Sequence, residues 1–481
     1  MLFNSIEFTI FLPIVFTLYW FIVNRNLKIQ NAFLLIISYL FYGWWDYRFL
    51  SLIILSSFVD YFVGLQMSKN DRKDQKKLFL SLSIFFNIGT LAFFKYYNFF
   101  IESFVDAFML FGQSFDYHRL NIILPIGISF YTFQTLSYSI DIYKGKMKPT
   151  NDIVAFFSFV SFFPQLVAGP IERASNLLPQ FYEKRTFEYS KATDGLRQIL
   201  WGLFKKIVIA DNCAVIVNDI FGNYTELAGS VLFLGAILFA FQIYGDFSGY
   251  SDVAIGTARL LGFNLSKNFA FPYFSRDIAE FWRRWHISLS TWFRDYIYIP
   301  LGGSRTKTQT QIRNVFIIFL ISGFWHGANW TFLFWGFLNA LYFLPLMLLK
   351  KNRKYVDSVA AKQKLIPSLK ELFQIGTTFF LTIIAWIFFR SSSIGDGFNY
   401  LHNMFSNSLF STPNLSTEEN QVFIFIGFLL LIEWVHREKE HGLEMSYSNT
   451  SIVFRWILYL FLITFIFYFG GKQQEFIYFQ F

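Results

Sequence analysis

The chain has 481 residues and a formal net charge of +9; 54% of its residues are hydrophobic and only 15% are charged. Since a soluble domain carries roughly 25% charged residues, and a disordered chain is poor in hydrophobic ones, both classes are excluded. The mean hydropathy of +0.40 and the 68 phenylalanines instead predict an all-α polytopic membrane protein.

Cysteine content and charge placement exclude two further classes. The single cysteine, Cys213, cannot form an internal disulfide, so a disulfide scaffold is ruled out and we expect an apolar packing residue. The basic residues cluster between apolar runs, as in loops that face an anionic membrane surface. Membrane lipid, and not nucleic acid, is therefore the expected partner of the positive charge.

A membrane helix needs about 20 apolar residues. In chain order, the predicted spans are 6–23, 31–44, 48–66, 78–96, 121–140, 152–168, 197–220, 229–246, 315–348, 373–390, 421–435 and 452–470. Several runs are short, so we expect about 11 to 13 membrane helices, with some half-spans. No unit of roughly 20 to 50 residues repeats, which argues against a solenoid or an inverted-repeat transporter.

Clusters of Lys and Arg set the expected orientation. They follow the first, third and fifth spans and the long apolar run, at 25–28, 69–77, 144–148 and 350–354. By the positive-inside rule these clusters face the cytoplasm, which predicts an N-terminus outside the cytoplasmic (inner) membrane. Alternation of the spans then places 391–420 outside, 436–450 inside and the C-terminus outside.

The segment 244–301 is the most informative part of the chain. It reads YGDFSGYSDVAIGTARLLGF and then FPYFSRDIAEFWRRWHISLSTWFRDYIYIPL. It is too polar for ordinary spanning helices and too aromatic for a solvated loop, so we expect irregular or re-entrant backbone that lines an internal cavity. Because ionisable residues within a membrane protein are functional-site candidates, those expected around the cavity are Asp246, Asp252, Arg283, Arg284, His286, Arg294 and Asp295.

A second unusual feature is the run 315–348, which contains no charged residue and is too long for one untilted span. At its centre, SGFWHGANW places His326 next to Trp325 and between Gly323 and Gly327. Glycines at these positions let another backbone or a thin ligand approach closely. Two interpretations stay open: a reactive imidazole, or a neutral histidine bonded to a neighbouring helix. The histidines outside these two segments lie in loops or at span edges.

A metal site is not expected. His286 and His326 are forty residues apart, with no cysteine partner and no HExxH pattern, so the spacing does not suggest zinc ligation. An imidazole with a pKa near neutrality is instead well suited to take a proton from a hydroxyl group and to return one to a leaving group.

Several long blocks occur in order along the chain. They are LPIGISFYTFQTLSYSIDIYKG (124–145), FFPQLVAGPIER (162–173), YGDFSGYSDVAIG (244–256), EFWRRWHISLSTWFRDYIYIPLGGSR (280–305), RNVF (313–316), SGFWHGANWTFLFWG (322–336) and WIFFRS (386–391). With these blocks the sequence resembles the membrane-bound O-acyltransferases, in particular their bacterial alginate O-acetylation branch. No matching block is found after residue 398.

The resemblance implies a fold and two catalytic residues. The invariant catalytic histidine of the family corresponds to His326, and a second signature position, His or Asn in different branches, corresponds to His286. The implied fold is a ring of tilted helices around a thinned central funnel with re-entrant segments. The implied division is into N-terminal membrane helices (1–120), a catalytic core (121–348) and C-terminal membrane helices (349–481).

The implied reaction is acyl transfer, most simply of acetyl, from a cytoplasmic thioester such as acetyl-CoA or an acylated carrier protein, with no tightly bound cofactor. His326 would be the general base. His286 would orient the acceptor or stabilise the oxyanion, with Asn329 or an indole N–H such as that of Trp325 assisting. The residues expected to line the substrate path are Asp246, Asp252, Arg283, Arg284, Trp325 and Asn329. For the two arginines, binding of donor phosphates and ion pairing with the nearby aspartates both stay open.

The expected acceptor is an extracytoplasmic polysaccharide such as alginate, reached through a periplasmic or surface acyltransferase of esterase fold. Teichoic acid, peptidoglycan, another exopolysaccharide or a lipid are alternative acceptors. Outside the enzyme class, a transporter or channel with buried proton-relay residues is the main rival, and a catalytically silent scaffold is another. Both signature histidines are present, which argues against the scaffold.

Overall fold

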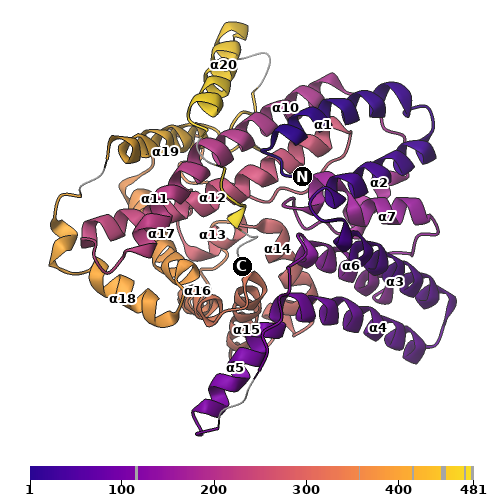
Figure 1. Cartoon of the computed structure of the whole chain (residues 1–481), viewed down its shortest axis with the longest axis horizontal. Coiled ribbons are helices and arrows are strands. Elements are labelled where there is room, and N and C mark those ends of the chain that lie inside the picture. Colours follow the sequence, from indigo (N-terminus) through magenta and orange to yellow (C-terminus); the bar gives the residue numbers. More distant parts are fainter. Residues whose placement is uncertain (114–116, 357, 414–415, 446–450, 471–472, 478–481) are drawn as a thin grey trace. The chain divides into compact units, whose positions relative to one another are not determined.

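The computed structural model describes all residues except 114–116, 357, 414–415, 446–450, 471–472 and 478–481, so the predicted position of the C-terminus lies outside the described residues. The described residues form helices and loops, with no strand among them (Figure 1). They divide into two compact units: unit 1 comprises 1–193 and 257–266, and unit 2 comprises 194–256 and 267–481. The predicted all-α class is confirmed.

The helices of unit 1 are α1 (Ile6–Thr17), η1 (Leu18–Ile22), α2 (Leu27–Gly43), η2 (Tyr47–Phe49), α3 (Leu50–Lys69), α4 (Lys73–Leu91), η3 (Ala92–Tyr96), α5 (Tyr97–Met109), α6 (Ile128–Tyr143), α7 (Ile153–Ser161), α8 (Phe163–Leu166), α9 (Ala174–Leu177) and η4 (Leu178–Phe181). Those of unit 2 include η5 (Phe204–Ala210), α11 (Asp211–Gly222), η6 (Pro272–Phe274), α13 (Ile278–Arg284), α14 (Ile287–Phe293), η7 (Arg294–Tyr298), η8 (Gly303–Arg305), α15 (Thr308–His326), α16 (Trp330–Leu348), α17 (Leu369–Arg390), α18 (Ile394–Met404), η9 (Asn407–Phe410), α19 (Thr417–Val435) and α20 (Ile452–Tyr468). Two helices, α10 (Tyr189–Leu203) and α12 (Gly229–Leu260), run from one unit into the other.

Among the described residues, five helical stretches are long and apolar enough to cross a bilayer: Tyr47–Lys69, Lys73–Met109, Gly229–Leu260, Trp330–Leu348 and Leu369–Arg390. Shorter apolar helices accompany them at Ile6–Ile22, Leu27–Gly43, Ile153–Leu166, Asn420–Val435 and Ile452–Tyr468. These stretches fall on or next to predicted spans, as expected of a multi-pass membrane protein.

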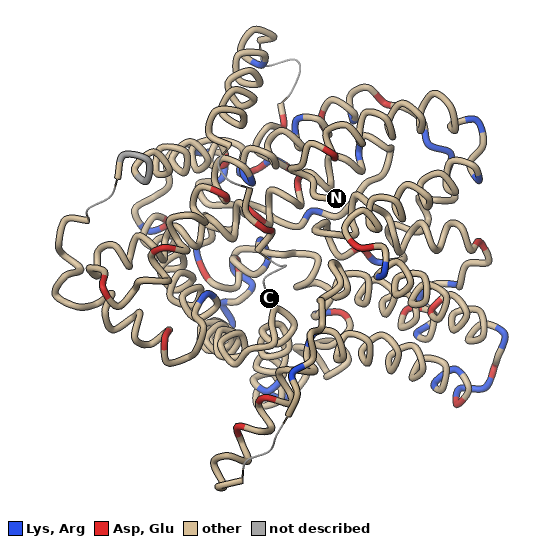
Figure 2. Tube along the Cα trace, viewed as in Figure 1, with Lys and Arg blue, Asp and Glu red and all other residues tan. Residues whose placement is uncertain are grey.

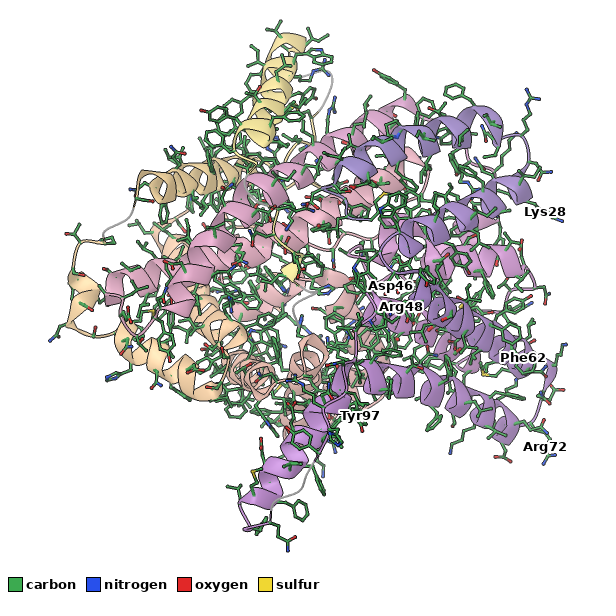
Figure 3. The ribbon with its side chains drawn as sticks, viewed as in Figure 1. Lys28, Asp46, Arg48, Phe62, Arg72 and Tyr97 are labelled. Carbon is green, nitrogen blue, oxygen red and sulfur yellow. The ribbon has the colours of Figure 1, made fainter. Side chains whose placement is uncertain are left out.

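Helix α3 is apolar outside and polar inside. It exposes Leu55, Phe58 and Phe62 (labelled in Figure 3) and buries Asp60, which is 0% exposed. The Asp60 carboxylate accepts hydrogen bonds from Ser83 (2.5 Å) and Asn87 (2.7 Å) of α4 and from Ser139 (2.6 Å) of α6. A hydrocarbon solvent favours this arrangement, because polar groups must find partners within the protein.

Two basic clusters of unit 1 lie at turns at the same end of its helices (Figure 2). Figure 2 shows Lys and Arg at the turns between α1 and α2 and between α3 and α4. Figure 3 labels Lys28 and Arg72 at these turns, whereas Asp46 and Arg48 lie at the opposite end of α2. Two of the clusters used to predict the orientation therefore lie at the same end of this helix group, as the positive-inside rule requires of adjacent hairpins.

The expectation of irregular backbone over 244–260 is wrong. Helix α12 continues through this segment to Leu260. Within its most apolar 18-residue stretch, 78% is buried inside the protein. Its two aspartates, Asp246 and Asp252, are compatible with a continuous helix because they pair with the buried lysines Lys206 and Lys205 of η5. The expectation holds for the part that follows, where α13 and α14 have seven residues each and flank His286.

The apolar run 315–348 is not one long span but a helical hairpin. Helix α15 ends at His326, and α16 begins after Asn329, whose Oδ1 accepts the Thr331 N–H (2.9 Å). This Asn cap provides the break that hydropathy alone does not reveal. The two helices pack closely because a Cβ on Gly323 would clash with the backbone of Phe332.

Candidate active site

His326 lies at the C-terminal end of α15 in an aromatic wall of unit 2. Its side chain is buried, at 2% exposure. The ring centroids of Trp325, Trp335 and Phe389 lie 4.9, 5.2 and 5.4 Å from that of the imidazole. These residues come from α15, α16 and α17, so packing of three helices defines the position of the imidazole.

The glycines next to His326 serve packing, not an open path for a thin ligand. A Cβ on Gly327 would overlap the Phe332 ring, and one on Gly323 would overlap the Phe332 carbonyl. The space that the sequence suggested for a ligand is therefore filled by the neighbouring helix of the hairpin, so the interpretation of these glycines as helix contacts is the correct one.

His286 lies between the short helices α13 and α14. Its backbone is left-handed (φ 43°, ψ 56°), a conformation that costs a non-glycine residue roughly 1–3 kcal/mol and indicates a site that the surrounding structure holds in place. The imidazole is 1% exposed, and Phe247, Phe269 and Trp325 surround it at ring-centroid distances of 4.6, 6.3 and 5.8 Å. Burial lowers the pKa of His286 to about 3, so the imidazole is neutral at physiological pH.

The two histidines belong to one aromatic cluster. Trp325 contacts both His286 and His326. A second connection consists of three indoles. The ring centroid of Trp386 lies 5.2 Å from that of Trp285, the residue before His286, and 5.5 Å from that of Trp335, which contacts His326. The structure therefore brings together His286, His326 and Trp325, which the sequence analysis singled out as site residues.

Asn268 is the main polar contact of His286. Its Oδ1 lies 3.0 Å from His286 Nδ1 and also accepts hydrogen bonds from the Ser288 hydroxyl (2.8 Å) and backbone N–H (3.3 Å). Its Nδ2 donates to Ser251 Oγ of α12 (3.0 Å). Asn268, Ser251 and Phe247 were not predicted from the sequence. Helical spacing was the available signal, because Phe247 and Ser251 lie on one face of α12 as an i, i+4 pair within the YGDFSGYSDVAIG block (244–256).

The two aspartates of α12 face other partners. Asp246 pairs with Lys206 (2.8 Å), which also pairs with Asp211 (2.7 Å). Asp252 pairs with Lys205 (2.6 Å) and accepts from Gln198 (2.7 Å). These contacts explain the buried charges without a ligand: each aspartate is matched by a buried lysine.

The arginines of the RRWH block hold a loop. Arg283 donates to the Asn352 carbonyl (2.8 Å) and Arg284 to the Ser358 carbonyl (3.1 Å). Arg284 also pairs with the buried Glu280 (2.9 Å). The structure therefore favours the second of the two open interpretations, in which the arginines bind groups within the protein. Their partners are Glu280 and backbone carbonyls, not the aspartates that we expected.

The seven ionisable residues expected around one cavity do not converge. Asp246 and Asp252 pair with lysines of η5, and Arg283 and Arg284 donate to the carbonyls of Asn352 and Ser358. Arg294 pairs with Asp295 (2.7 Å), and 57% of its side chain is exposed. Only His286 lies in the aromatic cluster with His326. The expectation erred because sequence proximity does not reveal that each charge has its own partner.

Asn329 likewise has partners within the protein. Its Oδ1 caps α16, and its Nδ2 donates to the Ser392 carbonyl at 3.2 Å. The amide therefore holds the turn after His326. Within the described part of the chain, no three His, Cys, Asp or Glu side chains lie close enough together to hold a metal ion. Cys213 is buried in the core of unit 2, as predicted.

The C-terminal segment forms part of the wall near His286, which the sequence did not suggest. Phe476 is fully buried and lies 6.0 Å from Phe247 and 4.6 Å from Tyr250. The backbone N–H of Ile477 donates to Asp246 (2.6 Å). The ion pair of Asp246 therefore anchors this segment behind the ring that contacts His286.

The chain is similar in sequence to known membrane-bound acyltransferases. Residues 38–368 match MBOAT, the membrane-bound O-acyltransferase family. The chain is 37% identical to the probable alginate O-acetylase AlgI of Pseudomonas aeruginosa over 433 residues, covering 90% of this chain and 80% of that one. It is 33% identical to the peptidoglycan O-acetyltransferase of Helicobacter pylori (100% and 98% covered) and 28% identical to the teichoic acid D-alanyltransferase of Bacillus subtilis (49% and 62% covered).

The chain therefore belongs to the membrane-bound O-acyltransferase family and is a multi-pass membrane enzyme of that class. The resemblance drawn from the sequence blocks is confirmed.

Proposed function

We propose that this enzyme moves an acetyl group from a cytoplasmic thioester donor across the membrane, for O-acetylation of an extracytoplasmic polysaccharide. The observation that carries the proposal is the pair of buried histidines, His286 and His326, in contact with the same indole of Trp325. A neutral imidazole in a water-poor aromatic wall can take a proton from a hydroxyl without competition from bulk solvent.

In the proposed reaction His326 is the general base. The acceptor oxygen attacks the thioester carbonyl as its proton passes to the imidazole, the carbon–sulfur bond then breaks, and the proton is returned to the departing thiolate. A base in this role contributes about 10²–10⁴-fold in rate. Since a thioester is already activated, the donor (acetyl-CoA or an acetylated carrier protein) is a co-substrate and no tightly bound cofactor takes part.

The proposed architecture is a ring of about 11 to 13 membrane helices around a thinned funnel, with His326 at its floor and both termini outside. Two features support a discontinuous helical centre. The chain is interrupted at both histidines, between α13 and α14 and between α15 and α16. The basic turns at one end of unit 1 support the orientation with those turns in the cytoplasm.

The proposed acceptor is an alginate-type polysaccharide, modified through a periplasmic or surface acyltransferase partner. Similarity to the probable alginate O-acetylase of Pseudomonas aeruginosa supports this choice. Peptidoglycan is the second candidate, because the peptidoglycan O-acetyltransferase of Helicobacter pylori aligns over the full length of this chain. The two candidates differ in which cell-surface polymer gains acetyl ester.

The test replaces His326 in cells. His326→Ala should abolish ester-linked acetate, measured separately on exopolysaccharide and on purified peptidoglycan, while protein abundance in the membrane stays the same. His402→Ala is the matched control, because His402 is exposed on α18. Undiminished acetylation with His326→Ala would contradict the role of the base, and acetate lost only from peptidoglycan would favour the second acceptor.

A further inference from the structure

His286 could act in two opposite ways, and its hydrogen bonds distinguish them. A ring nitrogen that carries a proton donates a hydrogen bond and can stabilise an oxyanion. A ring nitrogen with a lone pair accepts a hydrogen bond and can hold a hydroxyl group. The nitrogen that carries the proton is set by the partner of the other nitrogen.

The partner of Nδ1 is Asn268, and the orientation of its amide group is fixed by the backbone. The Ser288 backbone N–H lies 3.3 Å from one terminal atom of the Asn268 amide, and the Ser288 hydroxyl lies 2.8 Å from the same atom. A backbone N–H can only donate, so this atom must be the carbonyl oxygen Oδ1. The opposite end, Nδ2, then donates to Ser251 Oγ (3.0 Å).

The tautomer of His286 follows from the same oxygen. His286 Nδ1 lies 3.0 Å from Asn268 Oδ1. Since the oxygen can only accept, Nδ1 carries the proton, and in the neutral ring Nε2 is left with its lone pair. Burial of the imidazole favours the neutral ring.

Two backbone hydrogen bonds hold Asn268 against the histidine. The Ile287 N–H donates to the backbone carbonyl of Asn268 (2.9 Å), and the Ala270 N–H donates to the backbone carbonyl of Arg284 (3.0 Å). They fasten the 268–270 segment to the residues on either side of His286, including its left-handed turn. The distance from Asn268 Oδ1 to the imidazole is therefore set by the backbone.

We propose that Asn268 is a positioning residue that holds His286 as the Nδ1–H tautomer, so that Nε2 accepts a hydrogen bond from the acceptor hydroxyl. This role rests on the proposed acyl transfer and deepens it: His286 orients the hydroxyl and does not donate to the oxyanion. Ser251 of α12 completes the chain of contacts, which gives the GYSD block a role in the site.

The decisive test reads the tautomer directly. The full-length protein is labelled with ¹⁵N in its histidine rings and reconstituted in lipid nanodiscs, and the signals lost in His286→Gln identify His286. We expect a protonated Nδ1 and an unprotonated Nε2. A protonated Nε2 in the unmodified protein would overturn the proposal, whatever the activity.

Three variants then separate positioning from a structural role. Asn268→Leu should alter the His286 signals and lower kcat roughly 10- to 100-fold with little change in donor KM. Asn268→Asp retains the acceptor oxygen and should restore the Nδ1–H signal and most of the activity. Asn314→Leu is the control, because Asn314 is an equally buried asparagine. Its side chain donates a hydrogen bond to the Leu301 carbonyl and accepts one from Arg313. It should leave the His286 signals unchanged.

Each result bears on the proposal. If Asn268→Leu keeps the Nδ1–H tautomer, or Asn268→Asp does not restore it, the positioning role is wrong. If Asn268→Leu does not fold, the spectrum of the unmodified protein and the Asn268→Asp variant still decide the matter. Absence of acyl transfer in the unmodified protein, together with the expected tautomer, would instead contradict the proposed function alone.

Discussion

The indole of Trp325 lies 5.8 Å from the ring of His286, although its neighbour in the chain is His326. One residue therefore spaces two imidazoles that belong to different helical breaks. Filling this space with a rigid ring fixes the separation of the histidines better than a flexible side chain would, because Trp has only two side-chain torsions.

Replacing this ring tests the spacing. Trp325→Ala removes a buried ring and should lower the free energy of unfolding by about 3–5 kcal/mol and acyl transfer by more than tenfold. Trp325→Phe keeps an aromatic wall and should retain most of both. Thermal unfolding in detergent and acetyl transfer by purified protein measure the two effects. Full activity in a folded Trp325→Ala protein would contradict the spacing role.

The pair formed by Lys205 and Asp252 should behave as structure and not as substrate-binding machinery. Lys205→Met leaves the partly buried carboxylate of Asp252 (14% exposed) without its cation and should cost up to about 3–5 kcal/mol of stability. The double variant Lys205→Met, Asp252→Leu removes both charges and should recover most of that loss together with acyl transfer. If the double variant is stable but inactive, Asp252 has a role in the reaction that its contacts do not reveal.

Two glycines give a matched test of helix packing. Gly323→Ala should separate the helices of the hairpin and reduce the amount of folded protein, because the added methyl group would meet the backbone of α16. Gly376→Ala, in α17, meets nothing within 4 Å and should be neutral or stabilising by up to about 1 kcal/mol. Size-exclusion chromatography of both variants in detergent checks this, and equal behaviour would contradict the packing argument.

The orientation is tested by labelling single cysteines. In a Cys213→Ala background, a cysteine introduced at Lys73 should resist an impermeant thiol reagent applied to intact cells, because the 69–77 cluster is expected in the cytoplasm. A cysteine introduced at Asp46, at the opposite end of α2, is the positive control. Labelling of position 73 from outside, with position 46 protected, would reverse the proposed topology.

The sequence predicted the fold class and most of the apolar helices because both depend on local composition. The apolar run 6–23 corresponds to α1 and η1, and the run 373–390 to the latter part of α17. Local composition fails where tertiary partners decide. Helix α12 looked too polar to be continuous because Lys205 and Lys206, some forty residues earlier in the chain, were not recognised as its partners.

Local pattern also determined which residues of the site could be predicted. His286 and His326 stand in long recognisable blocks, so both were identified. Asn268 lies in the short, unremarkable segment SKNF and acts through a hydrogen bond to a residue 18 positions away. Nothing in its local pattern indicates that partner. Phe476 was missed for the same reason, since its neighbours lie on α12.

The most direct measurement follows the acetyl group and its carrier separately. Purified protein in liposomes receives a donor thioester labelled on both the acetyl group and the carrier, with the partner acyltransferase and a soluble acceptor on the other side. We predict that acetyl label reaches the acceptor while free carrier accumulates on the donor side, and that His326→Ala abolishes both. Passage of the intact donor across the bilayer in a His326-dependent manner would contradict acyl transfer and indicate a transporter.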